Sequence, residues 1–165
     1  APKPVVAGLN GVAAGAGASV ALACDLRVAS ERASLSFSFA GVGLVPDSGA
    51  TWFLTRMLGP ARAMELAFSG SALSSADAQA LGLVNEVVPA DEFEARLQAV
   101  AAGLAHGPTS ALALTKGLIE AAVSHTLDQQ LEAEALAQGV AGATQNHLEG
   151  VRAFLSKRAP EFEGR

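Results

Sequence analysis

The chain is organised around the stretch Gly41-Val-Gly-Leu-Val-Pro-Asp-Ser-Gly-Ala-Thr-Trp-Phe-Leu-Thr-Arg56, in which the acidic residue Asp47 follows a proline and precedes a predicted helix. We expect Ser48 and Gly49 to open this helix, which would place the Asp47 carboxylate in the field of a helix N-terminus. Two interpretations are open from this stretch alone. Aspartate is a preferred N-cap residue, and a carboxylate at a partly dry helix terminus can also serve proton transfer.

Three apolar residues accompany Asp47 in this stretch, namely Leu44, Val45 and Trp52. We expect them to restrict the access of water to the carboxylate. A dry surrounding strengthens electrostatic interactions with a reacting group, so these residues are predicted to line a substrate site.

Composition narrows the class of protein. The chain has 165 residues, enough for one domain with a proper core, of which 50% are hydrophobic and only 16% charged. The net charge is −5 and no run of Lys or Arg is present, which argues against a nucleic-acid partner. Residues 5–24 carry no charge, but Asn10, Ser19 and several glycines interrupt them, so we expect no membrane helix.

The one cysteine, Cys24, excludes an internal disulfide and has no Cys or His at a metal-ligand spacing. We interpret it as a small buried residue of a protein in a reducing compartment, the cytoplasm. His106, His125 and His147 are far apart in polar helical contexts and are predicted to lie on the surface. No metal site is predicted.

The secondary-structure pattern changes halfway along the chain. Apolar runs bounded by turns predict strands at 4–9, 25–29, 34–37 and 83–88, with a buried helix at 19–24 after the glycine-rich residues 15–17. Glycines and prolines delimit helices at 50–58, 61–68 and 74–81, and the pattern from residue 91 predicts four helices at 91–106, 108–124, 126–140 and 144–158. The first half therefore contains the strands, and the second half is helical.

The glycine-rich residues Gly15-Ala-Gly17 allow three interpretations. A strand, a glycine loop and a helix resemble a dinucleotide-binding turn, but Val20 replaces the third glycine of that fingerprint and no acidic residue follows at the expected distance. The small residues can also serve close packing of helix on strand. Alternatively, the backbone N–H of Ala16, left accessible by Gly15 and Gly17, can stabilise an oxyanion.

Four segments together resemble the crotonase (enoyl-CoA hydratase/isomerase) superfamily. They are Lys3-Pro-Val-Val-Ala-Gly-Leu-Asn-Gly-Val-Ala-Ala-Gly-Ala-Gly17, Ala23-Cys-Asp25, Gly43-Leu-Val-Pro-Asp-Ser-Gly49 and Ala76-Asp-Ala-Gln-Ala-Leu-Gly-Leu-Val84. The resemblance runs from Lys3 to the C-terminus and implies an α/β fold, the crotonase-like ββα superhelix. Residues 1–90 would form the C-terminal part of its spiral core, and residues 91–165 a helical oligomerisation region that makes a homotrimer or a dimer of trimers. It also implies a further N-terminal part, which carries a second oxyanion donor and much of the coenzyme A pocket.

Residue by residue, Ala16 matches the backbone oxyanion donor of the family, beside substrate-binding Gly15 and Gly17. The two glutamates of the hydratases would fall at Ser19 and Phe39, and neither residue is an acid. This departure argues against ordinary water addition, because a base must activate the water. Asp47 instead matches the lone acid of members that isomerise coenzyme A thioesters, and Val-Pro-Asp-Ser-Gly is most similar to the ring-1,2-epoxyphenylacetyl-CoA isomerases of phenylacetate degradation.

Near the C-terminus, Phe154 and Lys157 match family positions that contact coenzyme A across a subunit boundary, although a solvated lysine at a helix end is the alternative for Lys157. The resemblance implies an acyl-CoA isomerase in which Asp47 shuttles a proton, with coenzyme A present only as part of the substrate and no separate cofactor. Two alternatives stay open: an enoyl-CoA hydratase of the same superfamily, and a truncated, non-catalytic module of this fold.

Overall fold

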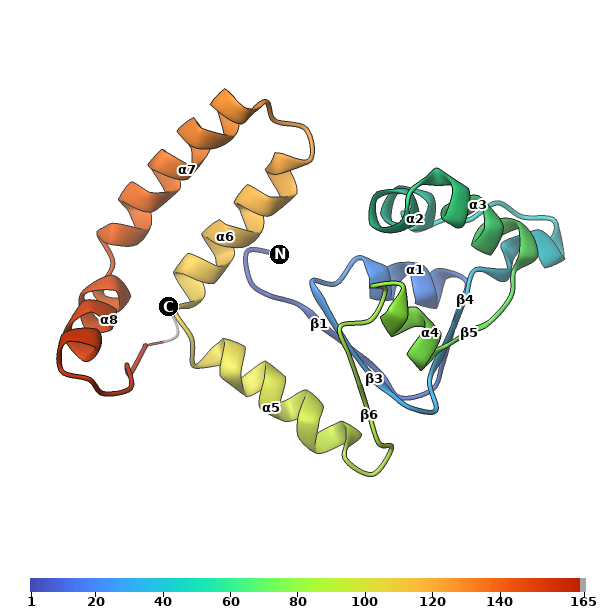
Figure 1. The fold of residues 1–165 in the computed structure, drawn as a ribbon, viewed down its shortest axis with the longest axis horizontal. Coiled ribbons are helices and arrows are strands. Elements are labelled where there is room, and N and C mark those ends of the chain that lie inside the picture. The colour runs from blue at the N-terminus through green and yellow to red at the C-terminus, as the bar shows by residue number, and fades with distance from the viewer. Residues whose placement is uncertain (164–165) are drawn as a thin grey trace. The chain divides into compact units, whose positions relative to one another are not determined.

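Two small sheets hold the strands of the protein (Figure 1). The computed structural model describes residues 1–163. The chain divides into one compact unit from Val5 to Gln98 and a second that combines Ala1–Pro4 with the residues from Ala99 on. The division falls within helix α5 (Phe93–Ala105), whereas the sequence placed it before this helix, at residue 91.

The first sheet is parallel and contains β1 (Val6–Leu9), β3 (Leu26–Ser30) and β6 (Glu86–Val88), with β3 in the centre. In the second sheet β2 (Val12–Ala14) pairs in parallel with β4 (Ser34–Ser36), which pairs antiparallel with β5 (Leu73–Ser74). Strands β1 and β2 come before α1, and strands β3 and β4 come before the next helical segment. In each pair the first strand joins the first sheet and the second strand joins the second sheet. This alternation agrees with the predicted ββα arrangement.

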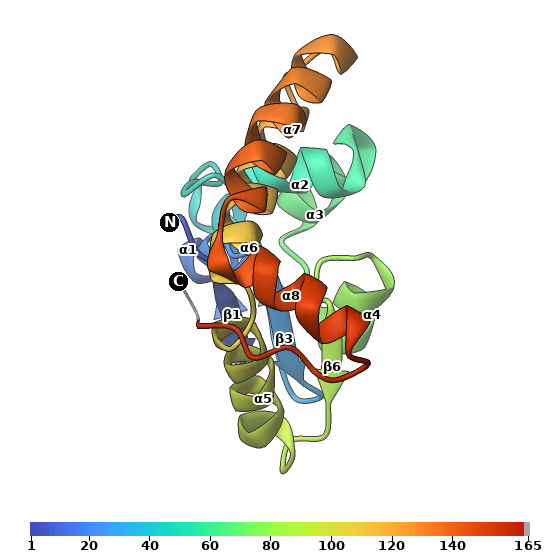
Figure 2. The same cartoon turned by 90° about the vertical axis from the view of Figure 1, so that its left-hand side faces the viewer.

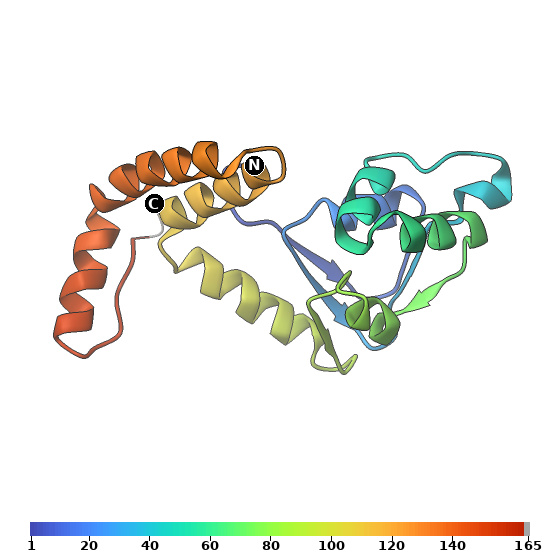
Figure 3. The ribbon, with the colours of Figure 1, turned by 45° about the horizontal axis from the view of Figure 1, so that its top comes forward.

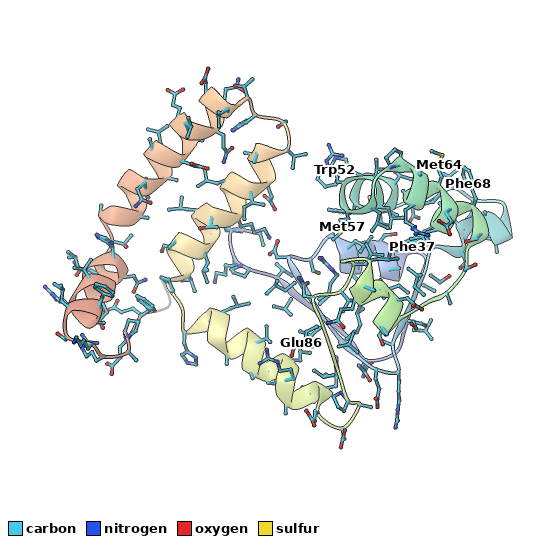
Figure 4. The ribbon with its side chains drawn as sticks, viewed as in Figure 1. Phe37, Trp52, Met57, Met64, Phe68 and Glu86 are labelled. Atoms are coloured by element: carbon cyan, nitrogen blue, oxygen red, sulfur yellow. The ribbon has the colours of Figure 1, made fainter. Side chains whose placement is uncertain are left out.

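Three helices cover these strands. Helix α1 (Ala16–Leu22) packs on α2 (Ala50–Leu58), and α2 packs on α3 (Pro60–Ser69) (Figure 1). Their buried side chains join those of the strands in one hydrophobic core, whose largest fully buried members are Phe37 (Figure 4), Leu35, Leu54 and Leu83. Besides Leu22, the buried residues of α1 are the small Ala18, Ser19 and Ala21, and small side chains let packed elements approach closely.

The predicted helix ends are confirmed. Gly59, Gly70 and Gly82 all have positive φ at or just after the ends of α2, α3 and α4 (Ser75–Ala80). Pro60 stands in the first turn of α3, and the hydroxyl of Ser74 accepts a hydrogen bond from the Asp77 N–H at the start of α4.

The sequence missed three short elements: β2, β5 and the 3₁₀ helix η1 (Ser38–Val42). Each has five residues or fewer, which is too short for a hydrophobic period to become visible. Cys24 was expected to be buried but is only partly so, because it lies in the turn just after α1.

The second unit is helical. Helices α6 (Thr109–Ala122) and α7 (Leu127–Gly142) run side by side (Figure 3), and α8 (Gln145–Leu155) follows α7 (Figure 2). Thr126 and Gln129 form a reciprocal capping box at the start of α7. Among the described residues, neither α6 nor α7 contains a fully buried side chain, and large apolar residues on them are exposed, including Ile119, Leu127, Leu131 and Leu136.

Within residues 1–163, no helix is long and apolar enough to cross a membrane. In the same range, no cluster of His, Cys, Asp and Glu side chains has the arrangement of a metal site.

Arg27 ties the first unit together from within. Its side chain on β3 is 5% exposed, and its guanidinium donates to the carbonyls of Leu83 (2.6 Å), Cys24 (2.5 Å) and Leu22 (3.4 Å). Burial lowers its pKa, while Cys24 and Asp25 act in the opposite direction. The Leu22 carbonyl belongs to the last turn of α1 and the Cys24 carbonyl to the turn after it, so the buried cation also meets the negative end of that helix.

We predict that Arg27→Met lowers the free energy of unfolding by about 2–4 kcal/mol, because buried carbonyls then lose their donor. Urea titration monitored by circular dichroism measures the change. Arg32→Met, which removes an exposed guanidinium from the neighbouring turn, is the matched control and should change stability little. Equal effects of the two substitutions would contradict the structural role of Arg27.

Candidate active site

The glycine-rich loop bends sharply into α1. Gly15 has φ 55° and ψ −127°, and its N–H donates to the carbonyl of Ser36 at 2.9 Å, which anchors the loop to β4. Helix α1 begins at Ala16, so the N–H groups of Ala16 and Gly17 have no helical carbonyl one turn earlier. Both residues are exposed. The loop therefore presents backbone donors at an accessible helix start.

The two positions without an acid lie against this loop. Ser19 is fully buried, and its hydroxyl donates to the Gly15 carbonyl at 3.1 Å. Phe39 is 8% exposed, and its ring would lie 3.8 Å from a Cβ added to Gly15. Both side chains are neutral and occupied in packing, so neither can take a proton from water.

Asp47 begins a tight turn before α2. The Ala50 N–H donates to the Asp47 carbonyl at 2.9 Å, and the two residues between them have positive φ, 51° at Ser48 and 85° at Gly49. This is the pattern of a type I′ turn. The N-cap of α2 is Gly49, without a side-chain capping bond, so the N-cap interpretation of Asp47 is wrong.

The carboxylate of Asp47 is exposed and, within residues 1–163, takes part in no hydrogen bond or ion pair. The expected dry wall around it is also not formed by this chain: the exposed fractions are 63% for Leu44, 79% for Val45 and 48% for Trp52. Leu44 and Val45 are exposed because residues 43–47 form a loop outside both sheets, whereas Trp52 lies on α2 with about half of its surface exposed. Only Pro46 in this loop is partly buried.

Trp52 is nevertheless held in place on α2 (Figure 4). The guanidinium of Arg56 lies 3.7 Å above the centre of its ring, a cation–π contact. Its ring also forms a T-shaped pair with the ring of Phe53, with centroids 4.9 Å apart and an angle of 77° between the planes. The sequence did not identify Arg56, although an arginine one helical turn after a tryptophan could have suggested the contact.

Helix packing connects the two loops. The glycine-rich loop precedes α1, the Asp47 turn precedes α2, and these two helices share one core through Ala18, Ala21, Ala50 and Leu54. The first unit thus brings together two of the predicted site features, a backbone donor and a single carboxylate, on two helices packed against each other.

The other two predicted residues, Phe154 and Lys157, belong to the second unit. Phe154 is 81% exposed at the end of α8. Lys157 follows that end with φ 52°, its N–H donates to the Phe154 carbonyl, and the Arg158 N–H donates to the Ala153 carbonyl, both at 3.1 Å. The two bonds form a Schellman motif, in which glycine usually takes the place of Lys157.

The sequence comparisons decide the family. All residues from 1 to 165 match the model of the family described as enoyl-CoA hydratase/isomerase. The chain belongs to the enoyl-CoA hydratase/isomerase family.

Named relatives in this family differ in the reaction that their names state. The chain is 45% identical to a probable enoyl-CoA hydratase of Rhodobacter capsulatus, over 99% of this chain and 64% of that protein. It is 44% identical to the 1,2-epoxyphenylacetyl-CoA isomerase of Escherichia coli K12, over 99% of this chain and 63% of that protein. A crystal structure of an enoyl-CoA hydratase from Polaromonas sp. JS666 matches with a TM-score of 0.92 at 44% identity, over 98% of this chain and 63% of that one.

These matches confirm the predicted crotonase-like fold. They also show that the chain spans less than two thirds of the length of these relatives. Relatives of this enoyl-CoA hydratase/isomerase family member are named for both reactions, so hydratase and isomerase have to be distinguished by the chemistry of the site.

A bidentate ion pair fixes the end of α8 in this family member. Arg158 donates to both carboxylate oxygens of Glu149, at 2.6 and 3.0 Å, and the Glu161 N–H donates to the same group at 3.0 Å. The bonds from Arg158 and Glu161 lower the pKa of Glu149 from 4.5 to about 2. The segment after Lys157 thus runs back alongside α8 (Figure 2), where the Glu163 N–H also donates to Asn146.

Because the folded-state pKa of Glu149 is lower than its ordinary value, the stabilisation from this pair is complete above about pH 4.5 and is lost as the pH falls towards 2. We predict that Glu149→Gln destabilises the protein at neutral pH, and that the gap to the parent protein narrows over this range. Urea unfolding at a series of pH values tests this. Glu132→Gln, which neutralises an exposed glutamate on α7, is the control, and a gap independent of pH would exclude the ion pair as the cause.

Proposed function

We propose that the protein is an acyl-CoA thioester isomerase in which Asp47 moves one proton between two carbon atoms of the substrate. One observation carries this proposal: Ser19 and Phe39 offer no acid for water addition, and the Asp47 carboxylate lies on the turn just before α2, the helix that packs on α1 after the glycine-rich loop. The similarity to the 1,2-epoxyphenylacetyl-CoA isomerase supports the same choice.

The glycine-rich loop at residues 15–17 supplies the electrostatic part of the mechanism. A thioester becomes acidic at Cα when N–H donors hold its carbonyl oxygen, because the enolate charge then develops against fixed dipoles. The Ala16 N–H is one such donor, and an accessible approach is provided by Gly15 and Gly17. Each donor of this kind stabilises the transition state by about 3 kcal/mol.

The proton transfer needs one carboxylate. For a 3-enoyl-CoA, the Asp47 carboxylate takes a proton from C2, and the electron pair of that bond spreads over the dienolate to the thioester oxygen. The resulting carboxylic acid returns the proton to C4, so the double bond moves from C3–C4 to C2–C3. Epoxide-ring isomerisation of an acyl-CoA is the second reaction of this class that we propose. Leu44, Val45 and Trp52 then contact the acyl group, whose arrival would cover them.

The coenzyme A part of the substrate is assigned to Phe154 and Lys157. Phe154 offers an exposed ring for stacking, and Lys157 offers an ammonium for phosphate. Lys157 adopts a left-handed conformation that costs a non-glycine residue roughly 1–2 kcal/mol. Glycine would adopt this conformation with less strain, so the presence of a lysine here supports a binding role for its side chain.

A homotrimer or a dimer of trimers is part of the proposal. Helices α6 and α7 have 14 and 16 residues, yet in the described chain no side chain of either is fully buried and several large apolar residues are exposed. Contiguous apolar surfaces of this kind usually belong to interfaces. We also propose the cytoplasm as the location, where a lone thiol such as Cys24 stays reduced.

A hydratase is the second candidate, because the relative in Rhodobacter capsulatus carries that name. Incubation of a 2-enoyl-CoA in H₂¹⁸O separates the two reactions, since only a hydratase yields labelled 3-hydroxyacyl-CoA. A non-catalytic module of the same fold would give neither product.

We predict that Asp47→Asn lowers kcat for the 3-enoyl to 2-enoyl shift by about 10²- to 10⁴-fold in the full-length protein, because the amide cannot accept the proton. Absorbance of the conjugated thioester measures the rate, and calorimetry with coenzyme A verifies that binding is kept. Asp91→Asn, at another exposed aspartate, should have no effect on kcat. Retained isomerisation in Asp47→Asn would refute the proposed function.

We predict that Lys157→Ala and Lys157→Gly weaken coenzyme A binding about tenfold, because both remove a charge-assisted hydrogen bond to phosphate. The glycine variant should be the more stable of the two, since glycine adopts the left-handed conformation freely. Isothermal titration calorimetry gives Kd, and thermal unfolding gives stability. Arg152→Gln controls for the loss of a positive charge on α8. An unchanged Kd in both Lys157 variants would show that Lys157 does not bind coenzyme A and is only solvated.

A further inference from the structure

The position of the Asp47 carboxylate depends on its backbone. In the described chain this side chain has no hydrogen-bonding or ionic partner, so no neighbouring group orients it. The backbone of Asp47 is held by the turn from Asp47 to Ala50. This turn is closed by the 2.9 Å hydrogen bond that the Ala50 N–H donates to the Asp47 carbonyl. Ala50 is fully buried, so this end of the turn is anchored in the core.

Two left-handed residues define that turn. Gly49, at φ 85°, adopts such a conformation without steric cost, whereas in Ser48, at φ 51°, the Cβ crowds the backbone and strains it. If Ser48 relaxed to a negative φ, the direction of the chain would change between Asp47 and α2. The strained residue is therefore the immediate neighbour of Asp47, and rotation about its backbone would move the carboxylate relative to α2.

The ring of Phe53 holds the other side of the turn. A Cβ added to Gly49 would lie 2.9 Å from Cε2 of Phe53, so this ring occupies the space next to the Gly49 backbone. The Phe53 N–H also donates to the Gly49 carbonyl at 3.0 Å. The ring of Trp52, which lies under the guanidinium of Arg56, forms a T-shaped pair with the same Phe53 ring. Gly49 is thereby locked by packing and by a hydrogen bond.

We propose that Ser48 and Gly49 are positioning residues, whose left-handed turn, packed on Phe53, holds the Asp47 carboxylate in its productive location. This inference rests on the proposed function, since it presupposes that Asp47 transfers the proton. Rotation of the turn displaces the carboxylate relative to the bound thioester and leaves the binding of coenzyme A unaffected. A displacement of about 1 Å is enough to lower a catalytic rate about 10²-fold.

The experiment compares kcat and KM of the 3-enoyl-CoA shift in turn variants of the full-length protein. In Ser48→Val the β-branched side chain disfavours the left-handed conformation, and kcat should fall at least about tenfold while KM changes less than about twofold. In Ser48→Gly the turn folds freely but is loosened, and kcat should fall by a smaller factor. Ser48→Asn tolerates the left-handed conformation and should restore nearly the parent kcat.

Gly82→Ala is the matched control for backbone strain. Gly82 has φ 78°, and no atom lies within 4 Å of an added Cβ, so alanine there imposes the conformational cost alone. It should lower the unfolding midpoint without changing kcat. Gly49→Ala adds both strain and the contact with Phe53, and should lower kcat as well as stability.

The outcomes separate the two hypotheses. Parent-like kcat in both Ser48→Val and Ser48→Gly, together with an inactive Asp47→Asn, would overturn the positioning role and leave the proposed function standing. An active Asp47→Asn would overturn the proposed function itself. If Ser48→Val does not fold, Ser48→Gly compared with Ser48→Asn decides the question.

Discussion

Hydrogen bonds at both ends of α1 are the constraint on which the rest of the site depends. Seven residues are too few for a helix that is stable by itself, so its place must come from tertiary contacts. At its start, the Gly15 N–H is bound to Ser36 on β4, and at its end, Arg27 holds the carbonyls of Leu22 and Cys24. The helix that begins at Ala16, the proposed oxyanion donor, is therefore anchored at both ends.

The second loop depends on the first through small side chains. Because Ala18 and Ala21 of α1 project little, α2 packs closely on α1 with Ala50 and Leu54 fully or almost fully buried. The turn that carries Asp47 ends at Ala50, so the core that fixes α2 also fixes the turn. Larger residues on this face of α1 would separate the helices and with them the donor and the carboxylate.

The sequence predicted the elements that glycine, proline and polar caps delimit, for example α3 between Pro60 and Gly70 and α4 after Ser74. It could not predict features that depend on distant parts of the chain. Arg27 stands out as a charge in an apolar strand, but its three carbonyl partners come from α1, the turn after it and Leu83. Likewise, an N-cap was one of two interpretations of Asp47, because nothing local indicated that Ser48 adopts a left-handed conformation and that Gly49 is the cap.

The neutral surroundings of the loop bear directly on the type of reaction. Hydration consumes a water molecule, so a hydratase must take a proton from water and deliver one to carbon, a task for which acids at the positions of Ser19 and Phe39 would be suited. Here Ser19 is committed to the Gly15 carbonyl, and Phe39 packs against the loop as a hydrocarbon. An isomerisation returns the same proton that it removed, so one carboxylate is enough for both proton transfers. The proposed site, with the Ala16 N–H as oxyanion donor and Asp47 on an anchored turn, would meet that requirement.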